Sequence, residues 1–500
     1  MTEVFSSLAY GFSVALTPTN LMWATVGSII GTLIGVLPGI GPVSGIAILI
    51  PVTYGMNPAS AMILLTAMYY GTMYGGSTTS ILVNVPGEAS SVVTTLDGYQ
   101  MARQGRAGPA LAIAAIGSFL AGTFSIVGLM LFAVPIISLA LRFGPAEYFG
   151  LMLLGLSSVT SLAGKSLVKA LLSMILGLVV STIGVDLSTG IARYTFGIPQ
   201  LLDGVGFLVV AIGLFAISEV LLAVEEIATA KREAIPVGRV WLAWKDFAAS
   251  WWAMIRGTVI GFYIGVLPAA GATIASFMAY DVEKRLAKDP SRFGKGDIRG
   301  VAAPESANNA AAVGNMVPLL TLGLPGSSTT AIMLGALMML GIQPGPLMYQ
   351  KNPDVFWGLI ASMYLGNAML LILNLPLVGL WVKILAIPER ILYPLILGVS
   401  VIGVYGVSGS LTDLLLACGF GLLGYYMRSH DYPVAPAVLG VVLGGLMEQS
   451  LRQALVLSDG SFWILVQRPI SLVLLILSAV SLASPYLIAA FRKFQGEPAF

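Results

Sequence analysis

The sequence predicts an all-α polytopic membrane protein, with about 10–12 transmembrane helices in two inverted repeats that contain broken or re-entrant segments. Three observations predict this class. Of 500 residues, 57% are hydrophobic and only 10% charged, whereas soluble domains carry about 25% charged residues. Apolar segments of about 20 residues recur without the alternating pattern of a β-barrel. The two halves of the chain also resemble each other, and glycine and proline interrupt their apolar segments at matching positions.

The expected organisation has four parts in chain order. Residues 1–224 form a first membrane repeat, and residues 225–249 form a cytoplasmic linker with an interfacial helix. Residues 250–460 form a second membrane repeat, and residues 461–500 form a C-terminal transmembrane helix and tail. The N-terminal stretch MTEVFSSLAYGFSVAL lacks a basic region and a cleavage site, so it is expected to stay in the mature protein.

The first interruption occurs in the stretch GTLIGVLPGIGP, residues 31–42. The stretch GFYIGVLPAAGA, residues 261–272, is identical to it at seven of twelve positions with an offset of 230. Each segment is expected to be a helix broken at its proline and followed by a short second helix, in a re-entrant arrangement. The expected hinge residues of this pair are Pro38, Gly39, Gly41, Pro268 and Gly271.

The second interruption carries the candidate substrate site. The stretch GGSTTSILVNVPGEASS, residues 75–91, aligns with GNMVPLLTLGLPGSSTT, residues 314–330, at an offset of 239, and the breaks fall at Pro86 and Pro325. A half-helix that starts inside the membrane directs its free amides and a partial positive charge at whatever precedes it. Hydroxyl side chains there both cap the helix and donate hydrogen bonds to a carboxylate. The predicted anion-binding residues are Gly87, Ser90, Ser91, Gly326, Ser327, Ser328 and Thr329.

Small residues also allow close helix contacts in membranes, so a purely structural role for these motifs is the competing interpretation. Glu88 stands where the second copy has a hydroxyl residue, so the two half-sites are not expected to be equivalent. Asp97 is a comparable acid of the first half.

A second polar cluster, PESANNAAAVGN, spans residues 304–315. Asn308 and Asn309 are predicted to contact the substrate, because an amide offers nitrogen to a carboxylate and oxygen to a cation. Asn84 and Asn315 are candidate sodium ligands beside carbonyl groups freed at the helix breaks. Glu305 follows a basic loop, and the sequence leaves open whether it is an interfacial helix-start carboxylate or a functional group.

Positive charges indicate the orientation of the two copies. Residues 281–300 contain six Lys and Arg, and residues 225–246 contain four, so both segments are expected to be cytoplasmic. The segments that align with charged loops of the other copy have no charge, and residues 55–58 and 342–352 are expected to be periplasmic. Equivalent loops that differ in this way are what inverted repeats predict.

Several classes of function are disfavoured. The single cysteine, Cys418, excludes a disulfide framework and cysteine-ligated metal sites. The single histidine, His430, lies in a polar loop-like stretch, and no acidic metal cluster is present. A membrane enzyme would need a nucleophile with its base or a metal centre, so no enzyme activity and no cofactor are expected beyond Na⁺ as a candidate coupling ion. The net charge of +2 gives no indication of nucleic-acid binding.

The motifs GTLIGVLPGIGP, YYGTMYGGSTTSILVNVPGEASS and PESANNAAAVGNMVPLLTLGLPGS, together with the chain length, resemble the large membrane subunit of the tripartite tricarboxylate transporters, the TctA-type proteins. The resemblance covers nearly the whole chain. It implies a multi-pass secondary transporter of the bacterial inner membrane that works in the lipid bilayer with a small membrane subunit and a periplasmic solute-binding protein. The implied substrate is citrate or another small organic carboxylate, and a sodium or proton gradient is the implied driving force.

From these observations we expect an importer that binds its anion near the membrane midplane and moves it by alternating access. Two alternatives stay open. A channel would need a continuous polar pore with charged rings, and the membrane segments offer almost no such charges. A scaffold subunit without its own carboxylate site would tolerate changes at Ser327 or Ser328.

Overall fold

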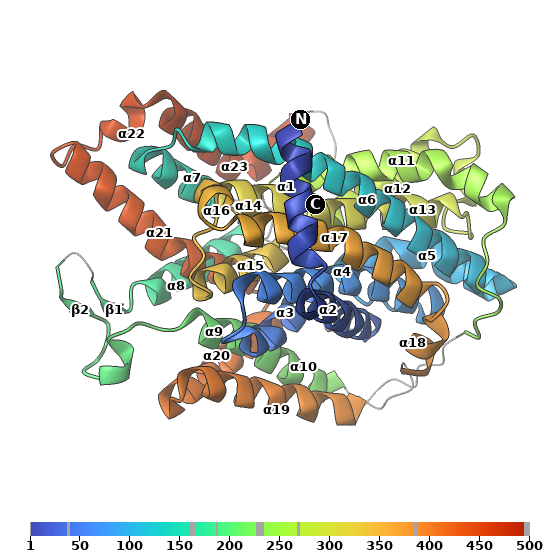
Figure 1. Cartoon of the computed structure of the whole chain (residues 1–500), viewed down its shortest axis with the longest axis horizontal. Helices are drawn as coiled ribbons and strands as arrows, with labels where there is room; N and C mark the ends of the chain where they lie inside the picture. Colours follow the sequence, from blue (N-terminus) through green and yellow to red (C-terminus); the bar gives the residue numbers. More distant parts are fainter. Residues whose placement is uncertain are drawn as a thin grey trace.

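The computed structural model describes residues 2–37, 41–157, 159, 166–186, 189–226, 235–267, 271–384 and 389–494. The described chain is almost entirely helical, and its strands β1 (Gly184–Val185) and β2 (Ala192–Arg193) form one short antiparallel ribbon. Figure 1 shows this ribbon at one end of the long axis and the helices α5 and α11 toward the other end.

The helices of the first half have the following bounds: α1 Thr2–Ala15, α2 Pro18–Val36, α3 Pro42–Leu49, η1 Ile50–Thr53, α4 Pro58–Val83, η2 Ala89–Ser91, α5 Val92–Met101, η3 Ala102–Arg106, α6 Ala107–Ala140, α7 Pro145–Ser157, α8 Leu167–Ser181, η5 Pro199–Leu201, α9 Phe207–Ala211, η6 Ile212–Ile217 and α10 Ser218–Glu226. Several of these helices begin with proline, because the first turn of a helix does not use the N–H group that proline lacks.

The helices of the second half are α11 Trp244–Val266, α12 Gly271–Leu286, η7 Pro290–Arg292, α13 Arg299–Gly314, α14 Met316–Leu322, α15 Ser328–Met339, α16 Pro346–Lys351, α17 Pro353–Asn374, α18 Val378–Ile384, α19 Glu389–Ser408, α20 Leu411–Ser429, α21 Ala435–Leu457, α22 Ile464–Gln467 and α23 Pro469–Phe494. The large buried core is formed mainly by α4, α6, α13, α14, α15 and α17.

Helices end and begin at the four interruptions of the sequence. In the first half, α2 is separated from α3 and α4 from η2; in the second half, α11 is separated from α12 and α14 from α15. Asn84 and Gly323, which are equivalent at the offset of 239, end α4 and α14 in the left-handed conformation with φ of 58° and 70°. This conformation favours glycine and asparagine because it carries a steric cost for most other residues. The predicted hinge residues Pro38, Gly39 and Pro268 lie outside the described residues.

The two halves also share a close helix contact. In each half a helix places three glycines, four residues apart, against backbone carbonyl groups of the following long helix. A Cβ atom added at any of these glycines would lie 2.2–2.4 Å from a carbonyl oxygen, which is too close for a side chain. The pairs are Gly27, Gly31 and Gly35 of α2 against Leu64, Met68 and Thr72 of α4, and Gly257, Gly261 and Gly265 of α11 against Ala303, Ala307 and Ala311 of α13.

The apolar helices fit a membrane protein. Among the described residues, the segments Pro18–Val36, Ala89–Ala140 and Pro353–Asn374 are long and apolar enough to cross a membrane. Seven further apolar helices have 10–17 residues. The breaks divide the apolar sequence into these shorter pieces, and a total of about 10–12 crossings stays a prediction.

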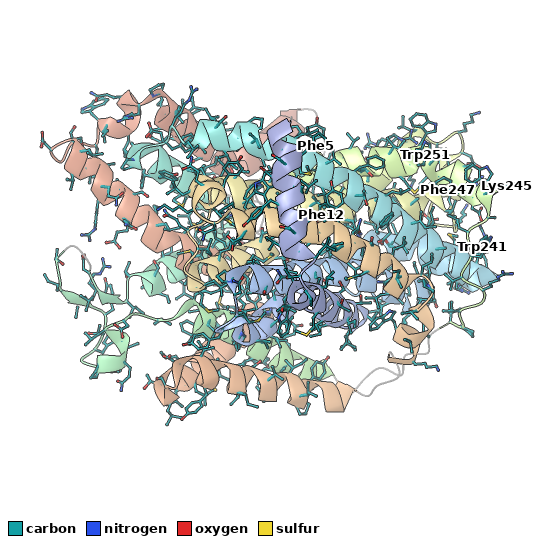
Figure 2. The ribbon with its side chains drawn as sticks, viewed as in Figure 1. Phe5, Phe12, Trp241, Lys245, Phe247 and Trp251 are labelled. Carbon is teal, nitrogen blue, oxygen red and sulfur yellow. The ribbon has the colours of Figure 1, made fainter. Side chains whose placement is uncertain are left out.

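Aromatic residues gather at the start of α11. Residues 235–243 have no regular secondary structure, and the part expected to form an interfacial helix supplies the first turns of α11. Trp241 and Trp244 are 68% and 78% exposed. Figure 2 shows Trp241, Lys245, Phe247 and Trp251 together at this end of the molecule. Such a mixture of rings and cations is typical of the membrane–water interface.

Candidate functional site

The helical segments that follow the four breaks meet at one cavity of about 380 Å³. The first residues of α3, η2, α12 and α15 line it, so four helical segments direct their N-termini at the same space. The lining residues used below are Gly41 before α3, Glu88 and Ser90 at the start of η2, Gly271 and Thr273 of α12, Ser327, Ser328 and Thr329 at the start of α15, and Tyr69 and Met73 of α4.

The electrostatics of this cavity favour an anion. Each helix N-terminus carries free amide groups and a partial positive charge, and such ends bind carboxylate and phosphate groups. Among the described residues, no Lys, Arg or His lines the cavity, and Glu88 is the acidic side chain in its wall. Recognition of an anion here therefore depends on amides and hydroxyls.

In the second half, Ser327 fixes the geometry of the site. Its hydroxyl accepts a hydrogen bond from the Thr330 N–H at 3.3 Å, and its own N–H donates to the Thr330 hydroxyl at 2.8 Å. This reciprocal cap begins α15 at the cavity wall. Ser328 and Thr329 make no side-chain hydrogen bonds within the described residues, so their hydroxyls are available to a ligand.

The first half repeats this cap with different chemistry. At the offset of 239, Glu88 corresponds to Ser327 and Ser91 to Thr330. The Glu88 N–H donates to the Ser91 hydroxyl at 3.3 Å, and Ser80 donates to the same hydroxyl at 2.9 Å. Ser91 is therefore engaged inside the protein, whereas Ser90 lines the cavity and donates to the Glu88 carboxylate. The two halves share a backbone arrangement, but one presents a carboxylate where the other presents hydroxyls.

The glycines of the Pro-Gly motifs lie behind the cavity wall. A Cβ atom at Gly87 would lie 2.1 Å from the Gly35 carbonyl oxygen, and one at Gly326 would lie 2.7 Å from Asn315 Oδ1. Pro86 and Pro325 precede them in the non-helical links. The motif glycines thus permit close packing that brings the hydroxyl residues to the cavity.

Asn308 and Asn309 belong to a buried network around Glu305 and are not part of the cavity lining. Asn308 Nδ2 donates to Glu305 Oε2 at 3.3 Å, and Asn309 Nδ2 donates to Ser118 Oγ at 2.7 Å. Ser77 and Thr94 donate to the same carboxylate. Glu305 is fully buried in the interior of α13, so it is not a carboxylate at an interfacial helix start.

The two candidate sodium ligands occupy different environments. Asn84 is exposed and ends α4, outside the cavity lining. Asn315 is fully buried, and its Nδ2 donates to the hydroxyl of Tyr69, which lines the cavity, at 3.2 Å. Its Oδ1 has no hydrogen-bond partner among the described residues.

Sequence reasoning missed several residues of this site. It did not identify Tyr69, Met73 or Thr273, because single residues on apolar helices carry no local signal of convergence. The sequence did indicate that Glu88 is special, because Glu88 occupies the position of Ser327 in the other copy.

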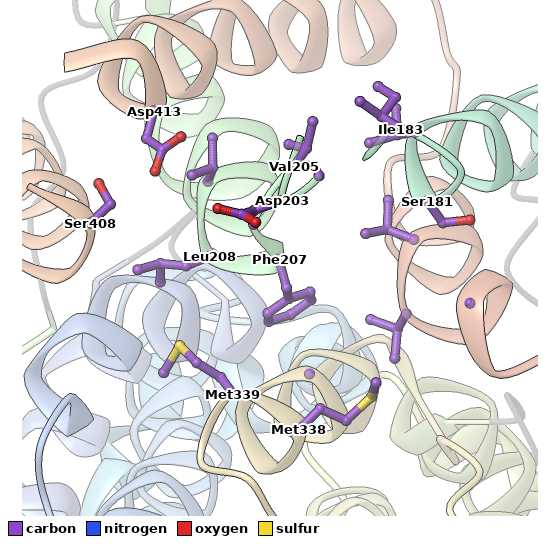
Figure 3. Close-up of a pocket in the computed structure, with 18 of the residues that line it drawn as sticks. Ser181, Ile183, Asp203, Val205, Phe207, Leu208, Met338, Met339, Ser408 and Asp413 are labelled. Carbon is purple, nitrogen blue, oxygen red and sulfur yellow. The ribbon is translucent and has the colours of Figure 1, made fainter. Parts of the chain in front are cut away.

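A second cavity, of about 420 Å³, lies near the β-ribbon and contains none of the predicted site residues. Figure 3 shows Asp203 and Asp413 toward one side of it and Met338 and Met339 toward the other. Its two carboxylates disfavour an organic anion, so it is the weaker candidate for the substrate site.

Comparisons with known proteins show the family of the chain. Residues 21–439 match the family described as the tripartite tricarboxylate transporter TctA family. An uncharacterized 52.8 kDa protein of the TAR-I ttuC' 3' region of Agrobacterium vitis is 47% identical over 483 residues, which cover 97% of this chain and 96% of that protein. An uncharacterized protein of the TAR-II ttuC' 3' region of the same organism is 48% identical over 220 residues, which cover 44% of this chain and 91% of that protein. No solved structure matches the chain. The match confirms the resemblance of the motifs, and the chain belongs to the TctA family of tripartite tricarboxylate transporters.

Proposed function

We propose that this chain is the translocating subunit of a tripartite importer of citrate-like organic carboxylates in the bacterial inner membrane. The observation that carries the proposal is the convergence of four helix N-termini on one cavity of about 380 Å³. Ser327, Ser328 and Thr329 supply hydroxyl donors that replace the water lost by a carboxylate. A small membrane subunit and a periplasmic solute-binding protein are the proposed partners.

The charge of the cavity supports coupling to a cation. A citrate-like anion would bring several negative charges into a wall that already contains Glu88 and that has no basic side chain among its described residues. Burying uncompensated charge is costly, so the loaded state requires cations or protons to enter with the substrate. A sodium or proton gradient would then drive uptake.

The repeated architecture supports an alternating-access mechanism. The glycines of the close contacts recur at an offset of 230 and the helix caps at an offset of 239. The cavity lies between elements of both halves. We propose that the halves are inverted, that α2–α3 and α11–α12 are re-entrant, and that rocking of these elements exposes the cavity to each side in turn. Residues 1–224 and 250–460 would then be the two repeats.

The test replaces the hydroxyls of α15. A double variant, Ser327→Ala with Ser328→Ala, removes donors worth roughly 1.5–3 kcal/mol each to a charged ligand. Uptake of labelled citrate into proteoliposomes or cells that contain the complete system should show an apparent affinity weakened by about ten-fold or more. Protein amount and membrane insertion should stay near normal, because loss of the Ser327 cap costs only about 1 kcal/mol.

Ser410→Ala is the matched control, because Ser410 also caps a helix, α20, but is not part of the cavity lining. It should destabilise the protein by about 1 kcal/mol and leave the apparent affinity unchanged. If the double variant also keeps its affinity, the cavity is not the substrate site and the scaffold alternative is favoured.

A further inference from the structure

A very small cavity lies between α4, α6 and α17, apart from the substrate cavity. Its volume of about 10 Å³ has room for one water molecule or one small ion. Five polar side chains line it: Tyr74, Ser77 and Thr78 of α4, Ser118 of α6 and Asn374 of α17. Three apolar residues of α6 complete the wall.

The side-chain amide of Asn374 is only partly hydrogen-bonded within the described residues. Its side chain is 4% exposed, and its Nδ2 donates to the Leu370 carbonyl oxygen at 3.0 Å. Its Oδ1 has no hydrogen-bond partner among the described residues. A buried carbonyl oxygen without a partner is unfavourable, and a ligand in the cavity would satisfy it.

Three of the five polar side chains in the wall offer lone pairs but no free hydrogen. The hydroxyl of Tyr74 donates to Asn367 Oδ1 at 2.6 Å, Ser77 donates to Glu305 Oε2, and Ser118 donates to the Glu305 carbonyl oxygen at 3.3 Å. Their hydrogens are thus already used, and their oxygens have lone pairs left. A water molecule needs acceptors for two hydrogens and donors for its own lone pairs, whereas a cation needs only oxygen ligands. The excess of lone pairs favours a cation.

A buried carboxyl group, that of Glu305, lies next to this wall. Glu305 is fully buried, and no Lys or Arg forms an ion pair with it in the part of the chain that the structure describes. Ser77 contacts both the Glu305 carboxylate and the cavity, and Ser118 contacts the Glu305 backbone. A carboxylate buried in a membrane domain is stabilised by a nearby positive charge, which this cavity would supply.

We propose that this cavity binds one monovalent cation of the size of sodium, held by oxygens of Tyr74, Ser77, Thr78, Ser118 and Asn374 and balanced by Glu305. The volume admits a bare sodium ion. This inference rests on the proposed function, because it assigns a binding site to the ion that would be transported with the substrate. Binding of the ion, however, can be measured without transport.

The test measures the thermal unfolding midpoint of the purified full-length protein while NaCl replaces choline chloride at constant ionic strength. A ligand that binds only the folded state raises the midpoint in a saturable way. We expect this rise for the wild-type protein with sodium. Thr78→Val keeps the shape of the side chain but removes its oxygen, and should weaken the apparent sodium affinity at least ten-fold. Asn374→Leu should do the same.

Thr66→Val is the matched control. Thr66 is a buried threonine of the same helix whose hydroxyl has no partner among the described residues, and it is not part of the cavity wall. This variant should keep the wild-type response to sodium. If Asn374→Leu does not fold, the isosteric Thr78→Val decides.

A wild-type midpoint that does not respond to sodium would overturn the proposal and indicate a water-filled cavity. A full sodium response in Thr78→Val would also overturn it. The two experiments test the two sites separately. If the midpoint responds to sodium and the Ser327, Ser328 double variant keeps its substrate affinity, only the carboxylate site is contradicted. A missing sodium response together with weakened substrate affinity contradicts only the cation site.

Discussion

Asp97 joins the two halves of the chain through a single carboxylate. Its Oδ1 accepts the N–H groups of Gly296 and Asp297, both at 2.8 Å, and its Oδ2 accepts the Tyr280 hydroxyl at 2.9 Å. The Gly294 N–H also donates to this carboxylate at 3.0 Å. Asp97 is fully buried, and it therefore fixes the loop between α12 and α13 to α5.

We predict that Asp97→Ala destabilises the protein, because it leaves several loop amides without a charged acceptor. Hydrogen bonds to charged groups contribute about 1.5–3 kcal/mol each, so the free energy of unfolding should fall by at least that amount. Unfolding in detergent, followed by thermal denaturation, measures the effect. Asp289→Ala is the control on the same loop, because Asp289 bonds only Ser291 and should have little effect. Equal losses in both variants would contradict the role of Asp97.

The neighbouring Asp297 makes a prediction about pH. Burial favours its neutral form, but hydrogen bonds and charge from Arg299 outweigh burial and lower the pKa of Asp297 below its usual value. A carboxylate with a folded-state pKa below its unfolded value contributes stability at higher pH and loses it as pH falls through the folded pKa. The difference in unfolding midpoint between wild type and Asp297→Asn should therefore be full at pH 6 and shrink below about pH 4. A difference that is constant with pH would contradict this ion pair.

The sequence predicted residues whose role depends on their immediate neighbours in the chain. It did not predict residues whose role depends on contacts with distant parts of the chain. Ser327 was predicted because a hydroxyl after Pro-Gly caps a helix whatever surrounds it. Ser91 has the same local pattern, but the structure directs it to Ser80 and away from the cavity. Glu305 follows a basic loop in the sequence, and only the packing of α4 and α5 against α13 shows that it is buried.

At the scale of helices, the duplicated glycine contacts set how closely α2 approaches α4 and α11 approaches α13. We predict that Gly31→Ala and Gly261→Ala each destabilise the protein, because the added Cβ atoms would lie 2.2 and 2.3 Å from carbonyl oxygens. Overpacking of this kind costs roughly 1–3 kcal/mol. Thermal unfolding of the purified variants measures the loss.

Gly419→Ala is the control for these two variants. Gly419 lies in α20 and has no atom within 4 Å of an added Cβ. Alanine has the higher helix propensity, so this change should leave stability unchanged or raise it slightly. If Gly31→Ala and Gly261→Ala behave like Gly419→Ala, the close contacts do not limit helix packing.

The helix breaks could be predicted from sequence because proline and glycine act within a few residues. Their convergence on one cavity could not, since α2–α3, α4–η2, α11–α12 and α14–α15 meet only through contacts between distant parts of the chain. The internal duplication gave part of this information. It showed which break in one half corresponds to which break in the other, but it did not predict that all four lie around the same cavity.

At the scale of the whole molecule, the β-ribbon and the loop held by Asp97 lie at opposite ends of the long axis (Figure 1). The loop belongs to the basic segment 281–300, which contains six Lys and Arg. Basic loops of membrane proteins face the cytoplasm, so the ribbon should face the periplasm.

Single cysteines test this orientation in a Cys418→Ser background, which removes the native thiol. We predict that Ile191→Cys, at an exposed position beside β2, reacts with a membrane-impermeant thiol reagent in intact cells. Lys288→Cys should react only after the cells are permeabilised, because the excess of positive charge in its segment retains that loop on the cytoplasmic side. Labelling of Lys288→Cys in intact cells, with Ile191→Cys protected, would reverse the orientation. The substrate cavity lies between elements of both halves, so a reversed orientation would also require the solute-binding protein to deliver its ligand from the aromatic end, where Trp241 and Trp244 are exposed.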